Sequence, residues 1–235
     1  QVVRLRSFGV TAGTVETVTV GAGAPQVSVT DAVAGAVGGT GGSSSFLNYT
    51  AAGGLGGKPS TSSTLGGNGG ASYTESTITA RSGTVSTVLK AGAVAVAGNS
   101  TCTVARNGGG GASSFAAGLQ TGGTALTSSA GANAIATNTL FGYEYSGGGG
   151  GHRDPVGSAS ITPAPGGAGG GGDGGVGTLT VGGTPTYATH GTNGTGGGGG
   201  GIGGTACKHS FDVGAGTTRG GSGAVVVKFL SPSPM

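Results

Sequence analysis

The stretch Asn193–Gly204, "NGTGGGGGGIGG", decides which folds this chain can adopt, because ten of its twelve residues are glycine or threonine. Shorter glycine runs of the same kind recur along the sequence. Glycine loses more conformational freedom on folding than any other residue, so it weakens both helices and strands. A protein that uses so much of it must gain something from the missing side chain.

The overall composition indicates an ordered but unusual protein. Glycine makes up 61 of 235 residues and charged residues only 7%, against about 7% glycine and about 25% charged residues in ordinary domains. Disordered chains combine low hydrophobicity with many charges, whereas 34% of this chain is hydrophobic. With six Phe, five Tyr and no Trp, it has little material for a large side-chain core. We therefore expect backbone packing to provide much of the stability.

Charge and hydropathy argue against two classes of partner. The ten Lys and Arg residues are scattered and the net charge is only +3, so we expect no binding to nucleic acid. No stretch approaches the roughly 18 consecutive apolar residues of a spanning helix, so we expect no membrane insertion. The chain begins with Gln, and we do not expect its first residues to act as a signal peptide. We expect residues 1–235 to form a single glycine-rich domain, processed or truncated from a longer product whose N-terminal part is missing.

Within the glycine runs, the residues that carry side chains recur at an interval of three. A polyproline-II-type helix has three residues per turn and rises about 3.1 Å per residue, so a G-G-X pattern places every X on one edge and leaves two edges bare. Bare edges let neighbouring helices approach. Since such a helix has no internal hydrogen bonds, its N–H and C=O groups must pair with adjacent helices. The positions that share the interval are Val37, Thr40 and Ser43; Leu65, Asn68 and Ala71; Leu55 and Lys58; Asp173 and Val176; and Ile202 and Thr205.

This pattern favours packed polyglycine-II helices over two alternatives. Isolated Gly/Ser-rich runs are usually flexible linkers, but apolar segments rather than evident domains separate the runs here. Collagen needs a long continuous Gly-X-Y period and much proline, and this chain has eight Pro in all. The apolar segments Thr14–Gly23, Val85–Gly98 and Gly223–Leu230 predict short strands. The predicted fold class is mostly β and irregular, with short β-strands, polyglycine-II helices formed by the G-G-X runs, and little α-helix.

Two segments of the chain contain the same kinds of sequence feature in the same order. Residues 15–46 and 85–115 each run from a predicted strand through glycines to a Ser-Ser-Phe sequence. They suggest an internal duplication in which Phe46 and Phe115 cover the exposed end of a glycine layer. Similar composition without duplication is the alternative.

Several quoted pieces carry a family resemblance. The opening "SFGVTAGTVETVTVGAGAP", the clusters "GGTGGSSSF" and "AAGGLGG", and the closing "GGSGAVVVKF" resemble the glycine-rich domain at the distal ends of bacteriophage tail fibres. The chain is also similar to the tail-tip adhesins of T-even-like phages, in which glycine clusters build a layer of polyglycine-II helices and variable loops touch the host receptor. The resemblance implies a virion protein, part of an extracellular particle. Its implied partners are a bacterial surface receptor (an outer-membrane protein or a glycan), other tail-fibre or virion proteins, and further copies in a homo-oligomer.

No catalytic constellation stands out. His152, His190 and His209 lack the characteristic spacing of metal ligands, and the glycine runs lack the strand-then-helix context of a phosphate-binding loop. We therefore expect no enzymatic activity, no catalytic residue, no cofactor and no metal. Cys102 and Cys207 are expected to be free thiols, with one disulfide as the alternative.

Residues suited to binding gather in two stretches. The segment "TLFGYEYSGGGGGHRDP" holds much of the aromatic and basic chemistry of the chain, and Tyr and Arg are enriched at binding hot spots. Its aromatics alternate in sequence, so one buried strand face is the alternative. The segment "TPTYATHGT" is the second candidate, with a solvated loop as its alternative. The predicted contact residues are Phe141, Tyr143, Tyr145, His152, Arg153, Tyr187 and His190.

These features favour one function and leave a competing one open. The favoured function is a non-enzymatic tail-fibre or adhesin module that contacts the host bacterial surface. The alternative is a purely structural glycine-rich virion protein, in a fibre or as a head decoration, or a self-assembling surface filament. An adhesin should display its aromatic residues at one exposed place, whereas a filament should bury them between identical subunits.

Overall fold

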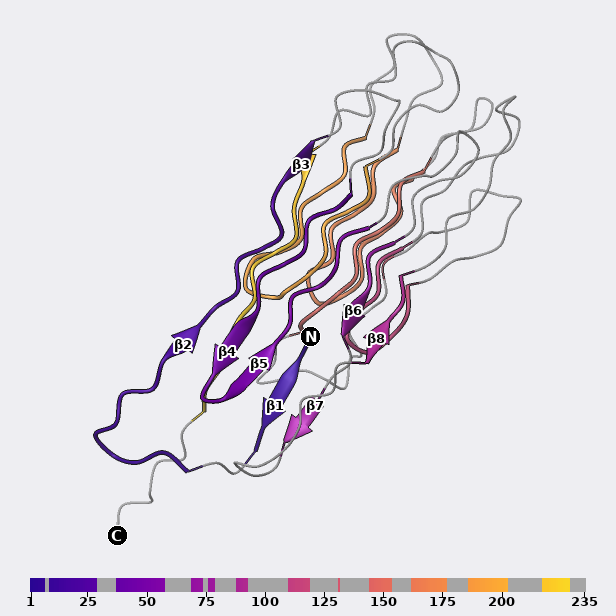
Figure 1. Ribbon diagram of the computed structural model, residues 1–235. Helices are drawn as coiled ribbons and strands as arrows, with labels where there is room; N and C mark the ends of the chain where they lie inside the picture. Colours follow the sequence, from indigo (N-terminus) through magenta and orange to yellow (C-terminus); the bar gives the residue numbers. More distant parts are fainter. Residues whose placement is uncertain are drawn as a thin grey trace, which may run out of the picture.

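The described part of the chain consists of short strands and long extended segments that run side by side (Figure 1). The computed structural model describes residues 1–6, 9–28, 37–57, 69–73, 76–78, 88–92, 110–118, 131, 144–153, 162–176, 186–202 and 217–228. These residues contain no helix, and so none that could cross a membrane. The predicted class, mostly β and irregular with little helix, is confirmed for them.

The strands are two or three residues long and form small separate sheets. β2, β4 and β5 make a three-stranded antiparallel sheet, while β1 pairs with β7 in parallel, and β3 with β9 and β6 with β8 pair antiparallel. The strands are β1 (Val3–Leu5), β2 (Val18–Thr19), β3 (Val27–Ser28), β4 (Ser44–Phe46), β5 (Tyr49–Ala51), β6 (Ser72–Tyr73), β7 (Ser76–Ile78), β8 (Leu89–Lys90) and β9 (Thr217–Thr218).

The three predicted strands form only in part. β2 lies within Thr14–Gly23, and β8 lies within Val85–Gly98, much of which falls outside the described residues. The prediction of a strand over Gly223–Leu230 is wrong for the described residues 223–228, which join none of the described sheets. Val226 there is 48% exposed, while Val225 and Val227 are half-buried, so the apolar run is only partly covered.

The turn between β4 and β5 has an unusual residue at its first position. Phe46 pairs with Tyr49, so Leu47 and Asn48 form a two-residue hairpin loop. Leu47 has φ of 54°, and Asn48 is not among the residues with positive φ, which is the pattern of a type II′ turn. Glycine is the residue favoured at that first position. A side chain held in such a backbone conformation costs roughly 1–3 kcal/mol.

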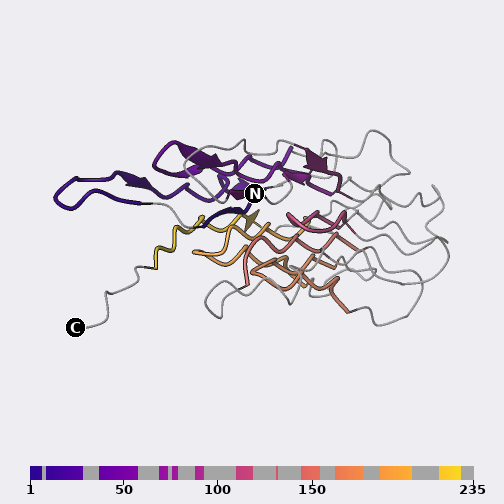
Figure 2. The ribbon, with the colours of Figure 1, turned by 90° about the horizontal axis from the view of Figure 1, so that it is seen from below.

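Side chains contribute little to the interior of the described residues. The buried hydrophobic residues there are Tyr49, Ile78, Ala112, Ala164 and Val176. Backbone hydrogen bonds between glycine segments take the place of a large apolar core. Figure 2 shows the N-terminal segments stacked on the later ones, and the two sets are joined where Ala112 N–H donates to Gly70 and Gly111 N–H donates to Gly149.

Three of the glycine segments form a closed set of hydrogen bonds with an interval of three residues. Segment 147–153 donates to segment 169–175, which donates to segment 198–201, which in turn donates back to the first. All the N···O distances lie between 2.7 and 3.0 Å. The donor–acceptor pairs are Gly147–Gly169, Gly150–Gly172, Arg153–Gly175, Gly172–Gly198, Gly175–Gly201, Gly198–Gly147 and Gly201–Gly150. The interval found in the sequence therefore recurs in the hydrogen bonding, while the polyglycine-II conformation itself stays a prediction.

The same contacts explain why these positions need glycine. A Cβ atom on Gly200 would lie closer than 3.0 Å to the carbonyl group of Asp173, and one on Gly174 would meet the carbonyl group of Gly151 equally closely. Real Cβ atoms essentially never approach other atoms so closely. The missing side chain thus lets one backbone lie directly against another, which is what the heavy use of glycine achieves.

Candidate contact surface

We call the hydrogen-bonded segments 147–153, 169–175 and 198–201 the glycine layer. The described contact residues predicted in the first stretch, residues 139–155, lie at two different ends of this layer. The run Gly147–Gly151 crosses the layer. At one end, Ser146 N–H donates to Thr195 at 2.8 Å; at the other, Arg153 forms a bridge to Val176. Tyr145 therefore lies beside the first end, and His152 and Arg153 lie at the second. The structure separates residues that the sequence places close together.

Arg153 lies inside the layer and not on its surface. Only 5% of the residue is exposed. Its Nη1 donates to the Thr162 carbonyl at 2.6 Å, and its main-chain N–H donates to Gly175 at 3.0 Å. Burial lowers the pKa of the Arg153 guanidinium, because desolvation disfavours the charged form. The side chain therefore joins the segment that begins at Thr162 to the end of the glycine run.

The second predicted stretch, residues 184–192, is described from residue 186 on. Residues 186–192 are hydrogen-bonded to the glycine layer. The N–H groups of Thr186, Thr189 and Thr192 donate to Val176, Asp173 and Gly170 respectively, at 2.9–3.1 Å. Donors and acceptors again step by three, and the two segments run in opposite directions. These residues are therefore a fixed edge of the layer, where a solvated loop was the alternative.

Tyr187 and His190 project from this fixed edge. Tyr187 is 55% exposed, and His190 is exposed as well. Tyr187 follows Thr186, whose backbone pairs with Val176, the residue that also bridges to Arg153. Exposed Tyr187 thus follows a residue whose backbone pairs with Val176, and Val176 bridges to Arg153 on its other side, at the same end of the layer as His152.

Two of the predicted contact residues belong to parts of the chain that the structure does not describe. Phe141 and Tyr143 lie outside the described residues, as do Cys102, Cys207 and His209. Within the described residues, no group of three or more His, Cys, Asp or Glu side chains is arranged to hold a metal ion.

A buried serine cluster was not predicted. Ser113 and Ser114 are 0% and 2% exposed, and Ser146 is 6% exposed. The hydroxyls of Ser114 and Ser146 are 2.6 Å apart, and Ser113 Oγ accepts from the N–H groups of Phe115 and Ala116. Ser146 has φ of 67°, an uncommon value outside glycine. The signal available in the sequence was a small hydroxyl residue directly beside a glycine run, where it can pair with backbone groups.

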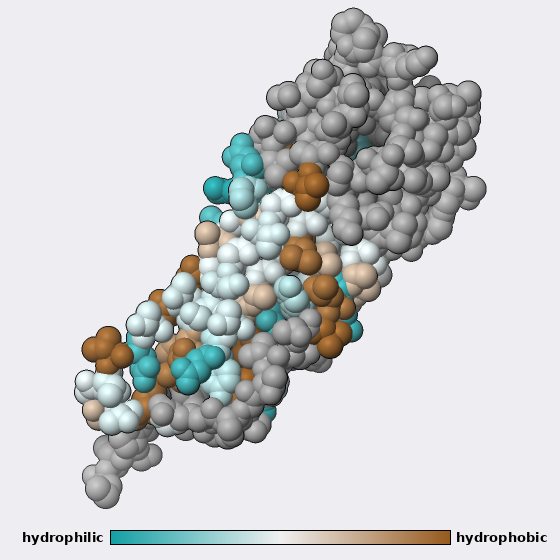
Figure 3. Space-filling model, in the orientation of Figure 1, coloured by the Kyte–Doolittle hydropathy of each residue, from teal (hydrophilic) through white to brown (hydrophobic). Residues whose placement is uncertain are grey.

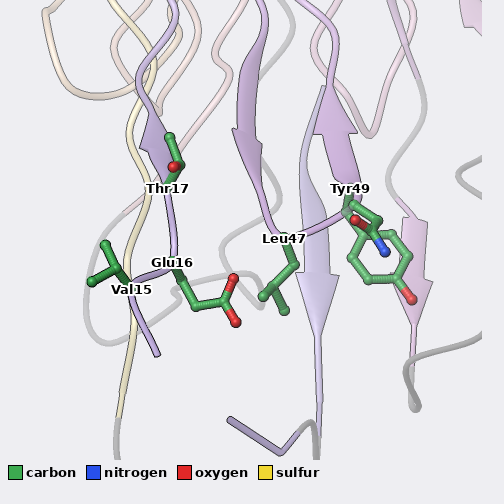
Figure 4. Close-up of a pocket in the computed structure, with 6 residues that line it drawn as sticks. Val15, Glu16, Thr17, Leu47 and Tyr49 are labelled. Carbon is green, nitrogen blue, oxygen red and sulfur yellow. The ribbon is translucent and has the colours of Figure 1, made fainter. Parts of the chain in front are cut away.

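A pocket of about 450 Å³ lies between the chain before β2 and the β4–β5 turn (Figure 4). Glu16 reaches from one side toward Leu47 on the other. The pocket is lined by Val15, Glu16, Thr17, Leu47, Asn48 and Tyr49.

Apolar residues do not form one continuous patch on the face seen in Figure 3. They lie there in several separate groups on a pale background of residues of intermediate hydropathy. The largest exposed fractions among the bulky apolar residues belong to Val15, Val37 and Val88, at 96%, 64% and 63%.

Comparison with known proteins identifies a family. A model of a glycine-rich domain family matches residues 1–230. The chain therefore belongs to this family of glycine-rich domains. No curated protein and no solved structure matches the sequence of this chain.

Proposed function

We propose that the protein is a tail-fibre or adhesin module of a virion that contacts the host bacterial surface. The observation that carries the proposal is Tyr187, which is 55% exposed although its backbone is held by hydrogen bonds at Thr186 and Thr189. Exposed aromatic residues on a rigid support lose little entropy on binding and bring both apolar area and a polar tip. The layer is the support, and Tyr187 with His190 makes the contact.

We further propose that the layer consists of packed polyglycine-II helices. Three-residue steps in the hydrogen bonds of segments 147–153, 169–175 and 198–201 support this, because such a helix repeats every three residues. Hydrogen bonds that leave each segment sideways, toward several neighbours, make the layer stiff without an apolar core. A stiff layer suits a fibre tip, which must transmit contact to the particle.

A purely structural role is the second candidate function. Glycine layers with little charge also suit a fibre body, a head decoration or a self-assembling filament. In that case the exposed Tyr187 would be covered by a neighbouring copy, and the purified protein would assemble into filaments.

Cell binding by the purified protein tests the proposal. Fluorescently labelled protein is incubated with a panel of bacterial strains, and the bound fraction is measured by flow cytometry. We expect binding to cells of some strains and a loss of about 2 kcal/mol or more in the variant with Tyr187→Ala and His190→Ala, as is typical of hot-spot residues. The matched control carries Val37→Ala and Val88→Ala, at two residues that are more exposed than Tyr187, and should bind normally. Filaments in electron micrographs, with no binding to any strain, would favour the structural role instead.

A further inference from the structure

Leu47 occupies a backbone position that the fold would fill better with glycine. Its φ is 54°, and the first residue of a type II′ hairpin turn is usually glycine. The chain contains 61 glycines, yet it places a branched apolar side chain here. Strained non-glycine residues of this kind cluster at functional sites. Leu47 is therefore a candidate for a functional contact.

The Leu47 side chain is only partly covered by the protein. Leu47 is only half-buried, and it is not among the buried hydrophobic residues, of which its neighbour Tyr49 is one. Its side chain instead forms one wall of the pocket of about 450 Å³, facing Glu16 across the opening (Figure 4). The pocket is open to solvent, since Val15, Thr17 and Asn48 in its lining are exposed, so it suits a small ligand that stays partly in water.

The chemistry of the pocket selects the class of ligand. Glu16 supplies two acceptor oxygens, the Asn48 amide supplies both a donor and an acceptor, and Thr17 adds a hydroxyl. Leu47 provides apolar contact, whereas the Val15 side chain is 96% exposed and points away from Leu47 (Figure 4). No Lys or Arg lines the pocket, so nothing in it would attract a phosphate or carboxylate. Acceptors and donors beside an apolar wall match a ring that carries neighbouring hydroxyl groups on one side and C–H groups on the other.

We propose that this pocket binds a neutral saccharide unit. The Glu16 carboxylate accepts from two adjacent hydroxyl groups, Asn48 donates to one ring substituent and accepts from another, and Leu47 packs against the C–H face. The site is built from other segments than Tyr187 and His190, and it stands or falls independently of the proposed function.

Two substitutions separate a binding role of Leu47 from a structural one. Leu47→Gly relieves the strained φ and removes the pocket wall, so the melting temperature should stay at or rise above the wild-type value, by about 2–4 °C for each kcal/mol of relief. Saccharide affinity should fall about tenfold or more. Glu16→Gln keeps the shape of the side chain but removes its charge, and it should weaken binding without changing the melting temperature. Val37→Ala, at an exposed valine outside the pocket, is the matched control.

The measurement is NMR titration of the full chain with glucose, galactose and N-acetylglucosamine at millimolar concentrations, following the amide signals of residues 15–17 and 47–49. We expect saturable shifts confined to these residues with at least one of the sugars. Absence of shifts with all three overturns the proposal, as does a lower melting temperature for Leu47→Gly. Shifts caused by methylamine, with none caused by the sugars, would show that Glu16 makes the pocket a cation site.

Discussion

Gly53 packs directly against the main chain of Gly41. A Cβ atom on Gly53 would lie closer than 3.0 Å to the carbonyl oxygen, the carbonyl carbon and the Cα of Gly41. At the next residue, Gly54, a Cβ would fit without a clash, because its nearest atom would be the Ala71 oxygen at 3.9 Å, an ordinary van der Waals distance. Two glycines adjacent in the sequence therefore meet very different surroundings.

We predict opposite effects of alanine at these two positions. Gly53→Ala must push two backbones apart and should lower the free energy of unfolding by about 1–3 kcal/mol. Gly54→Ala has room for its methyl group and restricts the unfolded chain, so it should be neutral or stabilising by up to about 1 kcal/mol. Thermal denaturation of both variants checks this. Equal melting temperatures would mean that the backbones are not in close contact.

A larger side chain at Gly200 should prevent folding. Gly200 lies in the longest glycine run, and a Cβ there would overlap the carbonyl group of Asp173. We expect Gly200→Val to lose the cooperative unfolding transition. Gly9, where a Cβ would meet nothing within 4 Å, is the control, and Gly9→Ala should unfold like the wild type. If Gly200→Val melted normally, the run would be a flexible linker.

The serine pair at one end of the glycine run should stabilise the fold through its hydroxyls. Ser146→Ala leaves the buried Ser114 hydroxyl without its 2.6 Å partner, which should cost about 1–3 kcal/mol. Ser146→Gly loses the same hydrogen bond but relieves the positive φ of 67°, so it should cost less. Urea denaturation of the two variants measures the difference. A glycine variant less stable than the alanine variant would show that the φ value is not strained.

Replacing Arg153 should destabilise the fold, whereas replacing Tyr187 should leave its stability nearly unchanged. Arg153→Ala removes a buried side chain and its hydrogen bond to Thr162, so we expect unfolding to become easier by roughly 2–4 kcal/mol. Tyr187→Ala removes a largely exposed side chain, and its stability should stay within about 0.5 kcal/mol of the wild type. Circular dichroism melts compare the two. A destabilised Tyr187→Ala would place that ring in the packed structure and remove it from the contact surface.

The sequence predicted the three-residue spacing of the hydrogen bonds in the layer, but not where the chain turns between its segments. The spacing of Asp173 and Val176 anticipated the hydrogen bonds that recur every third residue, because the period is local. Where the chain turns is not readable, since the same residue type builds both the straight runs and the turns. Gly170 and Gly194 have φ of 93° and 77° and lie at turns, and glycine adopts such values without steric cost.

The candidate site was predictable only in its composition. Tyr187 and His190 were found because their residue types suit binding, and they are exposed. The separation of Tyr145 from Arg153 could not be foreseen, because it depends on the run between them crossing the layer instead of folding back. The strain at Leu47 was equally hidden, since it follows from the pairing of β4 with β5 and not from the residue itself.

The claim on which the account rests is that backbone hydrogen bonds among glycine segments form the stable core. Amide hydrogen exchange measured by NMR tests it most directly, at the donors of the closed set of three segments. The account predicts that the N–H groups of Gly150, Gly172, Gly175, Gly198 and Gly201, which donate at 2.7–3.0 Å, exchange only through global unfolding and are among the slowest in the chain. Exchange of these five amides at the rate of an unstructured peptide would contradict it.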